Sequence, residues 1–181
     1  MNEKDWTIVD ILRHSRHDWL NKLQLIKGNL ALDRTDRVKE IIEEIVIETQ
    51  NEAKLTNLQL PQLAGYLLTY NWDSHHFYLE FEVLGHTYNL EKYDELIKDW
   101  CEKFFTVLDQ SVRNIGENHL SISIHPTETE VRFFFDFSGI ITDTGSLSEW
   151  LKSSYGDEAI RITEVNVNEQ ELTVELQVIC D

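Results

Sequence analysis

Residues 12–30 read LRHSRHDWLNKLQLIKGNL, and the apolar residues of this stretch recur at the spacing of one face of an α-helix. With Leu12 at zero and about 100° per residue, the other large apolar residues of this face lie within about 40° of it: Ile8, Trp19, Leu23, Ile26 and Leu30. Helical spacing without proline extends over roughly residues 5–58. The pattern therefore predicts amphipathic helix in this part of the chain.

The helical pattern is interrupted at residues 33–36, which read DRTD and favour turns and helix caps. We expect two helices that fold back as a hairpin over residues 1–58, the second being ended by Pro61. Leu20, on the flank of the first helix, is expected to reach an apolar stripe on the second: Val38, Ile41, Ile42 and Ile45. Because two helices alone cannot bury both stripes, the sequence predicts a homodimer with a four-helix bundle.

The spacing changes after a connector at residues 59–76, in which residues 62–72 are expected to form a short helix. Strand patterns follow at residues 77–84, 119–125 and 131–137, the last two about a turn that contains Pro126. Helical patterns occupy residues 91–113 and 146–154, and residues 160–167 and 171–179 form a predicted hairpin around Asn168. This βαββαββ order predicts an α/β sandwich over residues 77–181, with one sheet and helices on one face, so the fold class is α+β.

The charge of the chain is strongly negative and unevenly distributed. The 181 residues carry 16 Lys and Arg against 33 Asp and Glu, a formal net charge of −17, which disfavours binding to nucleic acid or to an anionic membrane. Residues 11–39 are the exception, because this segment contains seven basic residues and only three acidic ones. This basic segment is either a docking surface for an acidic partner or a solvated helix face, and charge alone does not choose between them.

The N-terminus and the cysteines predict a cytoplasmic protein. The first residues, MNEKD, lack the basic and then apolar pattern of a signal peptide, and no apolar run approaches the roughly 18 residues of a membrane span. Cys101 and Cys180 have no CxxC spacing, so we expect free thiols in a reducing compartment.

The open face of the first helix carries the residues that predict chemistry. His17 lies about 140° from the apolar stripe and Asn21 about 180° from it, one helical turn apart. Arg13, Gln24, Leu25 and Gly28 share that side. Leu25 offers a partner an apolar contact, and Gly28, a poor helix former, leaves room for close approach.

Other interpretations of His17 are possible. An exposed helical histidine most often has no function, and His14 with His17 at i,i+3 has metal-ligand spacing, although no third ligand is evident. A neutral imidazole, with an ordinary pKa of about 6.5, is a good phosphoryl acceptor near pH 7. Asp18 is adjacent in sequence and should not face His17, so its expected role is to fix the ring tautomer or accept a proton through water.

Residues 14–30 resemble the phosphohistidine helix of the sporulation initiation phosphotransferases of bacilli. The wider pattern, a histidine followed by an acid, an aromatic residue and an asparagine four positions on, resembles sensor kinases of the citrate and dicarboxylate type. The similarity to the phosphotransferases extends along the chain, through residues 75–85, 108–110, 117–120 and 136–137.

The resemblance implies a homodimer built on a four-helix bundle, with a C-terminal domain shaped like the ATPase domain of a histidine kinase. It implies that His17 takes a phosphoryl group from the aspartate of a single-domain response regulator and passes it to the aspartate of a sporulation transcriptional regulator. Asp18 and Asn21 would support His17, the regulator would bring Mg²⁺, and Lys22 would help to steer the regulator. The expected docking residues are Arg13, His14, Arg16, Gln24, Leu25 and Gly28.

One departure from the kinase pattern concerns ATP. The first glycine box of such a domain is reduced to residues 136–139, DFSG, and the later glycines, Gly145 and Gly156, do not make a second box. Without backbone donors around phosphates we expect no bound cofactor on this chain and a structural or docking role for the domain. The alternatives are an ATP-dependent kinase and a non-enzymatic dimeric module that sequesters a kinase or regulator.

Overall fold

The computed structural model describes residues 6–153 and 159–180, which divide into a helical unit up to Gln50 and a second unit from Asn51 onward. The helical unit contains α1 (Ile8–Ala31) and most of α2 (Thr35–Asn57). The turn between them places Asp33 at a φ of 55°, and the Asn29 carbonyl accepts hydrogen bonds from the Leu32 and Arg34 N–H groups. The predicted helical hairpin is therefore present.

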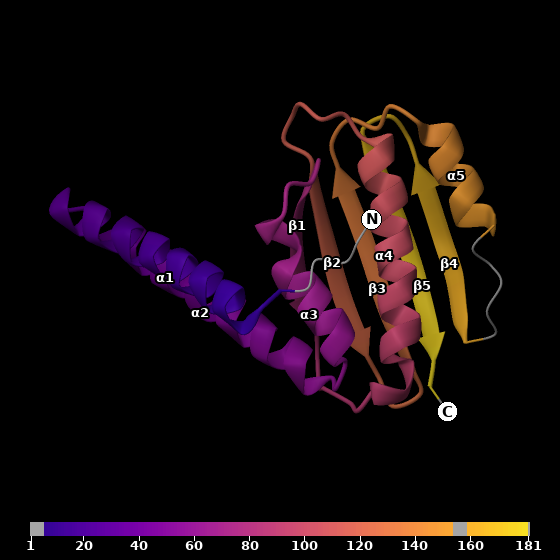
Figure 1. Cartoon of the computed structure of the whole chain (residues 1–181), viewed down its shortest axis with the longest axis horizontal. Helices are drawn as coiled ribbons and strands as arrows, with labels where there is room; N and C mark the ends of the chain where they lie inside the picture. The colour runs from indigo at the N-terminus through magenta and orange to yellow at the C-terminus, as the bar shows by residue number, and fades with distance from the viewer. Residues whose placement is uncertain (1–5, 154–158, 181) are drawn as a thin grey trace. The chain divides into compact units, whose positions relative to one another are not determined.

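The second unit is a five-stranded sheet with helices on one face (Figure 1). Its elements are α3 (Pro61–Thr69), η1 (Tyr70–Trp72), β1 (Tyr78–Val83), η2 (Glu91–Tyr93), α4 (Asp94–Ser111), β2 (His119–Pro126), β3 (Glu130–Ser138), α5 (Thr144–Ser153), β4 (Ile160–Val167) and β5 (Glu171–Ile179). The strand order is β1-β2-β3-β5-β4, with β1 parallel to β2 and every other pair antiparallel. This arrangement confirms the predicted α+β class and the βαββαββ order.

The core of the second unit lies between the sheet and α4, with α3 and α5 packed beside α4 (Figure 1). Alternate residues of β2, β3 and β5 are fully buried, and the intervening residues face solvent. Aromatic rings fill much of this core, among them Trp100, Phe104, Phe105, Phe133, Phe135 and Phe137. The end of α2 and the residue that follows it also belong here, because Leu55 of α2 and Leu58 just beyond it have no exposed surface.

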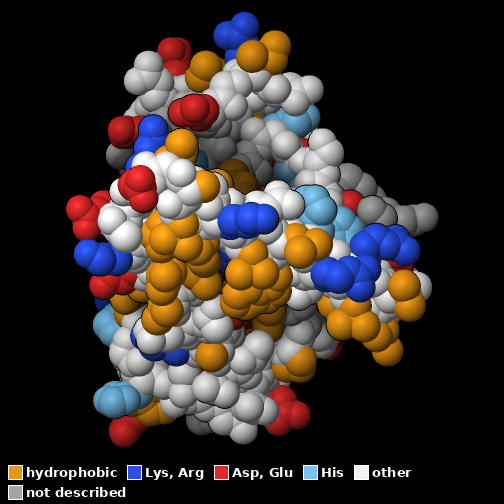
Figure 2. Space-filling view, turned by 90° about the vertical axis from the view of Figure 1, so that its left-hand side faces the viewer, with side chains coloured by type: hydrophobic (Ala, Val, Ile, Leu, Met, Phe, Trp, Pro, Cys, Tyr) orange, Lys and Arg blue, Asp and Glu red, His pale blue; other side chains and the backbone are white. Residues whose placement is uncertain are grey.

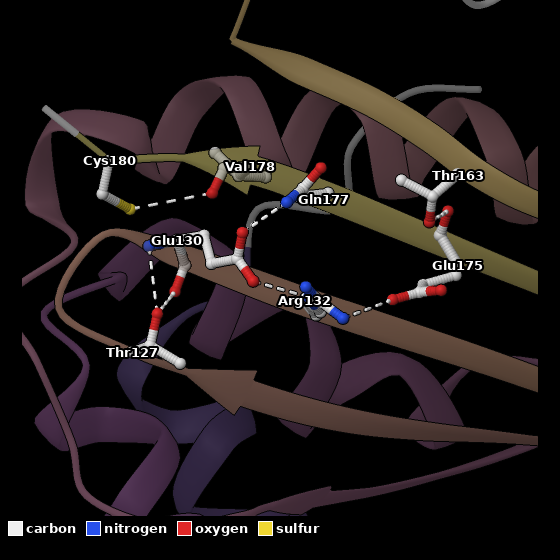
Figure 3. Close-up of polar contacts among 8 residues, drawn as sticks. All are labelled: Thr127, Glu130, Arg132, Thr163, Glu175, Gln177, Val178 and Cys180. Carbon is white, nitrogen blue, oxygen red and sulfur yellow. Dashed lines mark hydrogen bonds and ion pairs between the residues drawn. The ribbon is translucent and has the colours of Figure 1, made fainter.

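The solvent face of the sheet is held by polar contacts between neighbouring strands (Figure 3). Arg132 on β3 lies 2.6 Å from the Glu130 carboxylate and 3.5 Å from the Glu175 carboxylate on β5. Gln177 donates a second hydrogen bond to Glu130. These two bonds hold the pKa of Glu130 below its ordinary value, the bond from Gln177 having the larger effect.

Two sequence interpretations of proline are wrong. Pro61 does not end the second helix, because α2 already ends at Asn57 and Pro61 is the first residue of α3. Proline suits that position, where its missing N–H has no helical acceptor. Pro126 is not in the turn but is the last residue of β2, paired with Val131.

The segment at residues 59–76, which we described as a connector, is part of the second unit's core. Leu63, Ala64 and Leu67 of α3 and Tyr70 of η1 are all buried. The Asp94 carboxylate, on α4, accepts hydrogen bonds from the Gln62 and Leu63 N–H groups at 2.9 and 3.0 Å and so caps the start of α3.

Within the described part of the chain, none of the helices has the length and apolar character needed to cross a membrane.

Candidate functional site

His17 lies in the third turn of α1 with its side chain 72% exposed. The helix starts close by, at Thr7, whose hydroxyl accepts a hydrogen bond from the Asp10 N–H at 3.2 Å. The sequence Thr7-Ile8-Val9-Asp10 has the spacing of a helix-capping motif and would have located this start, although the sequence interpretation did not use it. The Thr7 hydroxyl also donates a hydrogen bond to the Asp10 carboxylate. This bond, together with the positive charge of Arg13, holds the pKa of Asp10 below its ordinary value.

Asn21 contacts the inner nitrogen of the His17 ring. Its side-chain amide nitrogen lies 3.2 Å from His17 Nδ1, as the i,i+4 spacing predicts. With the amide nitrogen toward the ring, Nδ1 accepts a hydrogen bond and the ring proton is on Nε2. With the amide reversed, its oxygen accepts a hydrogen bond from the Nδ1–H group and Nε2 keeps a free lone pair. The orientation of the Asn21 amide and the tautomer of His17 are therefore linked through this contact.

Asp18 is closer to the ring than its sequence position suggested. Its Oδ1 atom is 3.7 Å from His17 Nδ1, which is beyond a direct hydrogen bond but close enough for a bridging water. The expectation that neighbouring residues point apart on a helix holds for their Cβ directions, but the flexible Asp18 side chain reaches back toward the ring. Both polar neighbours of His17 thus lie at Nδ1.

The expected docking residues on the open side of α1 are at the surface. Leu25 is 56% exposed, and Arg16 and Gln24 are exposed. A methyl group added to Gly28 would meet nothing within 4 Å, so this glycine is not required by packing within the chain. Arg13 is exposed but forms an ion pair with Asp10 at 3.0 Å.

His14 and Lys22 are placed differently from the other predicted residues. The His14 ring is half-buried and packs edge-on against Trp6, with 4.9 Å between ring centroids. Lys22 is engaged within the chain, because its ammonium group forms an ion pair with Glu48 of α2 at 2.6 Å. This contact shows that the flank of α1 carrying Lys22 faces α2. Leu20 lies on the opposite flank and is 50% exposed, so it does not pack on α2 as expected.

The apolar stripe of α1 is uncovered in the single chain. No residue of α1 is buried, and Leu12, Trp19, Leu23 and Leu30 are each at least half exposed. On α2, Val38 and Ile41 are buried, whereas Ile42 and Val46 are 46% and 47% exposed. Hydrophobic side chains gather in exposed patches on the surface seen in Figure 2. Exposed apolar surface of this extent marks an interaction surface.

Other reactive groups are poorly placed for catalysis. Across residues 6–153 and 159–180, no three His, Cys, Asp or Glu side chains are grouped to hold a metal ion. Burial raises the pKa of the Cys101 thiol, which keeps it protonated and unreactive. At the reduced glycine box, a Cβ on Gly139 would overlap the Asn118 side-chain oxygen, so packing accounts for this glycine without a nucleotide.

Comparisons with known proteins match both parts of the chain. A family described as the alpha-helical domain of Sensor_kinase_SpoOB-type proteins matches residues 1–58, and one described as Sporulation initiation phospho-transferase B, C-terminal, matches residues 59–179. The sporulation initiation phosphotransferase B of Bacillus subtilis (strain 168) is 42% identical over 165 residues, which are 90% of this chain and 85% of that protein. The chain belongs to the sporulation initiation phosphotransferase B family.

Histidine kinases are among the solved structures similar to this member of the phosphotransferase B family. The catalytic domain of histidine kinase ThkA is 11% identical with a TM-score of 0.40, and the alignment covers 70% of this chain and 92% of that one. The blue-light activated histidine kinase EL346 of Erythrobacter litoralis is 9% identical with a TM-score of 0.42, over 98% of this chain and 61% of that one. Likenesses this distant carry no argument about chemistry.

Proposed function

We propose that this chain is a phosphorelay histidine phosphotransferase in which His17 is in turn phosphoryl acceptor and donor. The observation that carries the proposal is the asymmetry of the His17 ring: both polar neighbours lie at Nδ1, and the side chain is 72% exposed. Nε2 is therefore the nitrogen offered to a partner. Family membership supports a phosphotransferase role in sporulation.

In the first step, the Nε2 lone pair attacks the phosphorus of an aspartyl phosphate on a single-domain response regulator. A P–N bond forms, the P–O bond to the aspartate breaks, and the carboxylate leaves with the electron pair. In the second step, the carboxylate of a sporulation transcriptional regulator attacks the same phosphorus and Nε2 leaves. Mg²⁺ held by each regulator offsets the charge on the phosphoryl oxygens, and this chain contributes no metal ligand.

Asn21 and Asp18 would act on the proton of the ring. Attack by Nε2 requires the tautomer with hydrogen on Nδ1. Asn21 would stabilise that tautomer with its amide oxygen turned toward the ring, in place of the amide nitrogen that lies 3.2 Å from Nδ1. The phosphorylated ring becomes positively charged if it retains this proton, and the Asp18 carboxylate 3.7 Å away offsets that charge or takes the proton through water. The second step returns this proton to the ring. Because the phosphoryl group comes from the aspartyl phosphate of the first regulator, the proposed transfer uses no ATP and no cofactor on this chain.

The proposal includes a homodimer in the cytoplasm. The half-exposed apolar stripe of α1, with Ile42 and Val46 of α2, would be buried against the same surface of a second copy as a four-helix bundle. His17 lies on the other side of α1 and would stay accessible. The cytoplasm suits the two cysteines, which form no disulfide in the structure.

The deciding experiment uses a single-domain response regulator labelled with ³²P on its aspartate, mixed with the full-length chain in the absence of ATP. We expect an acid-labile, base-stable label on the wild-type chain, and none on His17→Ala at the same dimer content. Label that persists on His17→Ala would disprove the assignment of His17. Tight regulator binding without any label would support the non-enzymatic sequestering module, and labelling by ATP alone would support a kinase.

A further inference from the structure

The two edges of the sheet differ in whether their backbone groups are already bonded. At the β1 edge, the Asn71 side chain bonds to both backbone groups of Leu79, accepting from its N–H at 3.0 Å and donating to its carbonyl at 2.7 Å. Further along, Val83 donates its N–H to the Asn51 side chain at 3.3 Å and accepts from Lys54 at 3.0 Å. These side chains occupy the positions that an added strand would need, so the β1 edge is blocked.

The outer edge of β4 is open between Val165 and Val167. The Asn168 N–H bonds to the Glu171 carbonyl at the base of the β4-β5 hairpin, at 2.9 Å. Because bonded and non-bonded pairs alternate in an antiparallel ladder, the N–H and carbonyl groups of Val165 and Val167 point away from β5. Neither residue has a backbone partner on that side among the described parts of the chain.

A groove runs beside this open edge, between β4 and α5. Its volume is about 350 Å³, and it is lined by Ser148, Leu151, Lys152, Val165 and Val167. The side chains of Val165 and Val167 point to the same face of the sheet as α5, which packs against β4. Val165 remains 37% exposed. Among the described residues that line the groove, Lys152 alone is charged.

We propose that the β4 edge and this groove bind an extended peptide segment of a partner protein. The segment would add to the sheet as a sixth strand, bonded to the backbone of Val165 and Val167. An apolar side chain of the segment would enter the groove against the two valines, and a carboxylate would pair with Lys152. The partner is thus identified as a strand with an apolar and an acidic residue. The site uses nothing of His17, so it stands independently of the proposed phosphotransfer.

The probe for this site is a synthetic peptide with the sequence of β5, ELTVELQVI, which is complementary to β4 within the fold and carries both apolar and acidic side chains. Hydrogen exchange of the full-length protein is measured with and without the peptide. We expect saturable binding that slows exchange at the Val165 and Val167 amides and leaves the β1 amides unchanged. A proline-substituted version of the peptide, which cannot complete the ladder, is the control.

Matched variants then separate the backbone from the groove. Val165→Pro removes an N–H that β5 does not use, and should weaken peptide binding by about fivefold or more, the loss of one hydrogen bond. Val165→Thr keeps that N–H and should stay within about twofold. Lys152→Gln should also weaken binding several-fold, with a smaller dependence on salt.

Three results with the peptide would overturn the proposal, and so would one result without it. They are no saturable binding at millimolar peptide, peptide-induced protection elsewhere on the sheet, and equal binding by wild type and Val165→Pro in a folded protein. Concentration-dependent growth beyond a dimer that Val165→Pro abolishes would also overturn it, because the occupant would then be a second copy of this chain. The exchange measurement on the unaltered protein does not depend on the variants folding.

Discussion

Gly139 is packed against Asn118 so closely that any side chain at residue 139 would overlap the Asn118 side-chain oxygen. Asn118 itself is buried and cannot move aside without loss. Its amide nitrogen donates to the His76 and Arg113 carbonyls at 2.8 and 2.7 Å, and its oxygen accepts from the Ile140 N–H at 3.0 Å. Gly139 therefore serves the packing of one loop on another.

Gly139→Ala should therefore destabilise the second unit by about 1–3 kcal/mol, the usual cost of overpacking a filled site. The added methyl would also lie 2.7 Å from Phe137 Cζ, so relief requires movement on two sides. Chemical unfolding followed by circular dichroism measures the change. Stability equal to wild type would show that the Asn118 network is looser than described.

Gly28→Ala provides the opposite case. Since a methyl group there meets nothing within 4 Å, we expect α1 to become more stable by up to about 1 kcal/mol, the difference in helix propensity. Phosphoryl transfer should fall nonetheless, because the added methyl occupies the surface that a regulator approaches. Thermal unfolding and the transfer assay measure the two effects in one preparation. A variant that is more stable and equally active would remove Gly28 from the docking surface.

Leu23 and Leu25 form a matched pair, since they are 55% and 56% exposed in the single chain but lie on different sides of α1. Leu23→Ala should weaken the dimer by about 2–5 kcal/mol, because the proposed bundle buries this side chain. Leu25→Ala should leave the dimer intact and weaken regulator binding. Sedimentation at several concentrations, combined with a regulator titration, distinguishes them. The reverse result would mean that the helix phase assigned to His17 is wrong.

Asn21 variants test the control of the ring tautomer. Asn21→Ala should lower the rate of transfer at saturating regulator by about tenfold, with little change in regulator affinity, because the contact is to Nδ1 and not to the partner. Asn21→Asp keeps an oxygen acceptor for the Nδ1 proton and should recover most of the rate. Single-turnover kinetics separates rate from affinity. An equal loss in both variants would indicate that the amide acts as a donor to Nδ1.

His75 makes stability depend on pH. Its ring stacks on Tyr70 with 3.9 Å between centroids, and burial lowers its pKa, an effect that the nearby Asp109 and Asp73 only partly oppose. The folded protein thus favours the neutral ring, and its contribution is complete above the ordinary histidine pKa of about 6.5 and declines as pH falls below that value. His75→Phe keeps the stacking, so it should gain stability relative to wild type between about pH 6.5 and pH 5. Urea midpoints of the variant and the wild type across this range measure the difference. A difference that stays the same at every pH would contradict the prediction.

Much of the fold could be predicted from periodicity, because the stripe on α4 and the alternation along β2, β3 and β5 reflect burial directly. Proline was less informative, since its fixed φ and missing N–H suit the start of a helix, as at Pro61, as well as a break. Pro126 is tolerated in β2 because the pairing with β1 already ends at Ile124. The sequence pattern indicated a break at both prolines, but it did not distinguish a helix start or a strand end from a helix end or a turn.

In the candidate site, too, features within one helix could be predicted from the sequence, whereas contacts between separate parts of the chain could not. The exposure of His17 and its contact with Asn21 depend only on position along one helix, and both could be predicted. The ion pair between Lys22 and Glu48 joins residues of two helices, and its partner cannot be known before the hairpin is placed. The edge-on packing of His14 on Trp6 depends on how the chain enters α1, for which helical spacing gives no information.

The last turns of α2 have an evolutionary consequence. The two family matches meet between residues 58 and 59, yet Leu55 and Leu58 are fully buried in the unit that begins at Asn51. Recombination at the junction of the two families would therefore leave the sandwich with a hole where two leucines had been. A crossover near residue 50 would instead keep both leucines with the sheet that they help to cover.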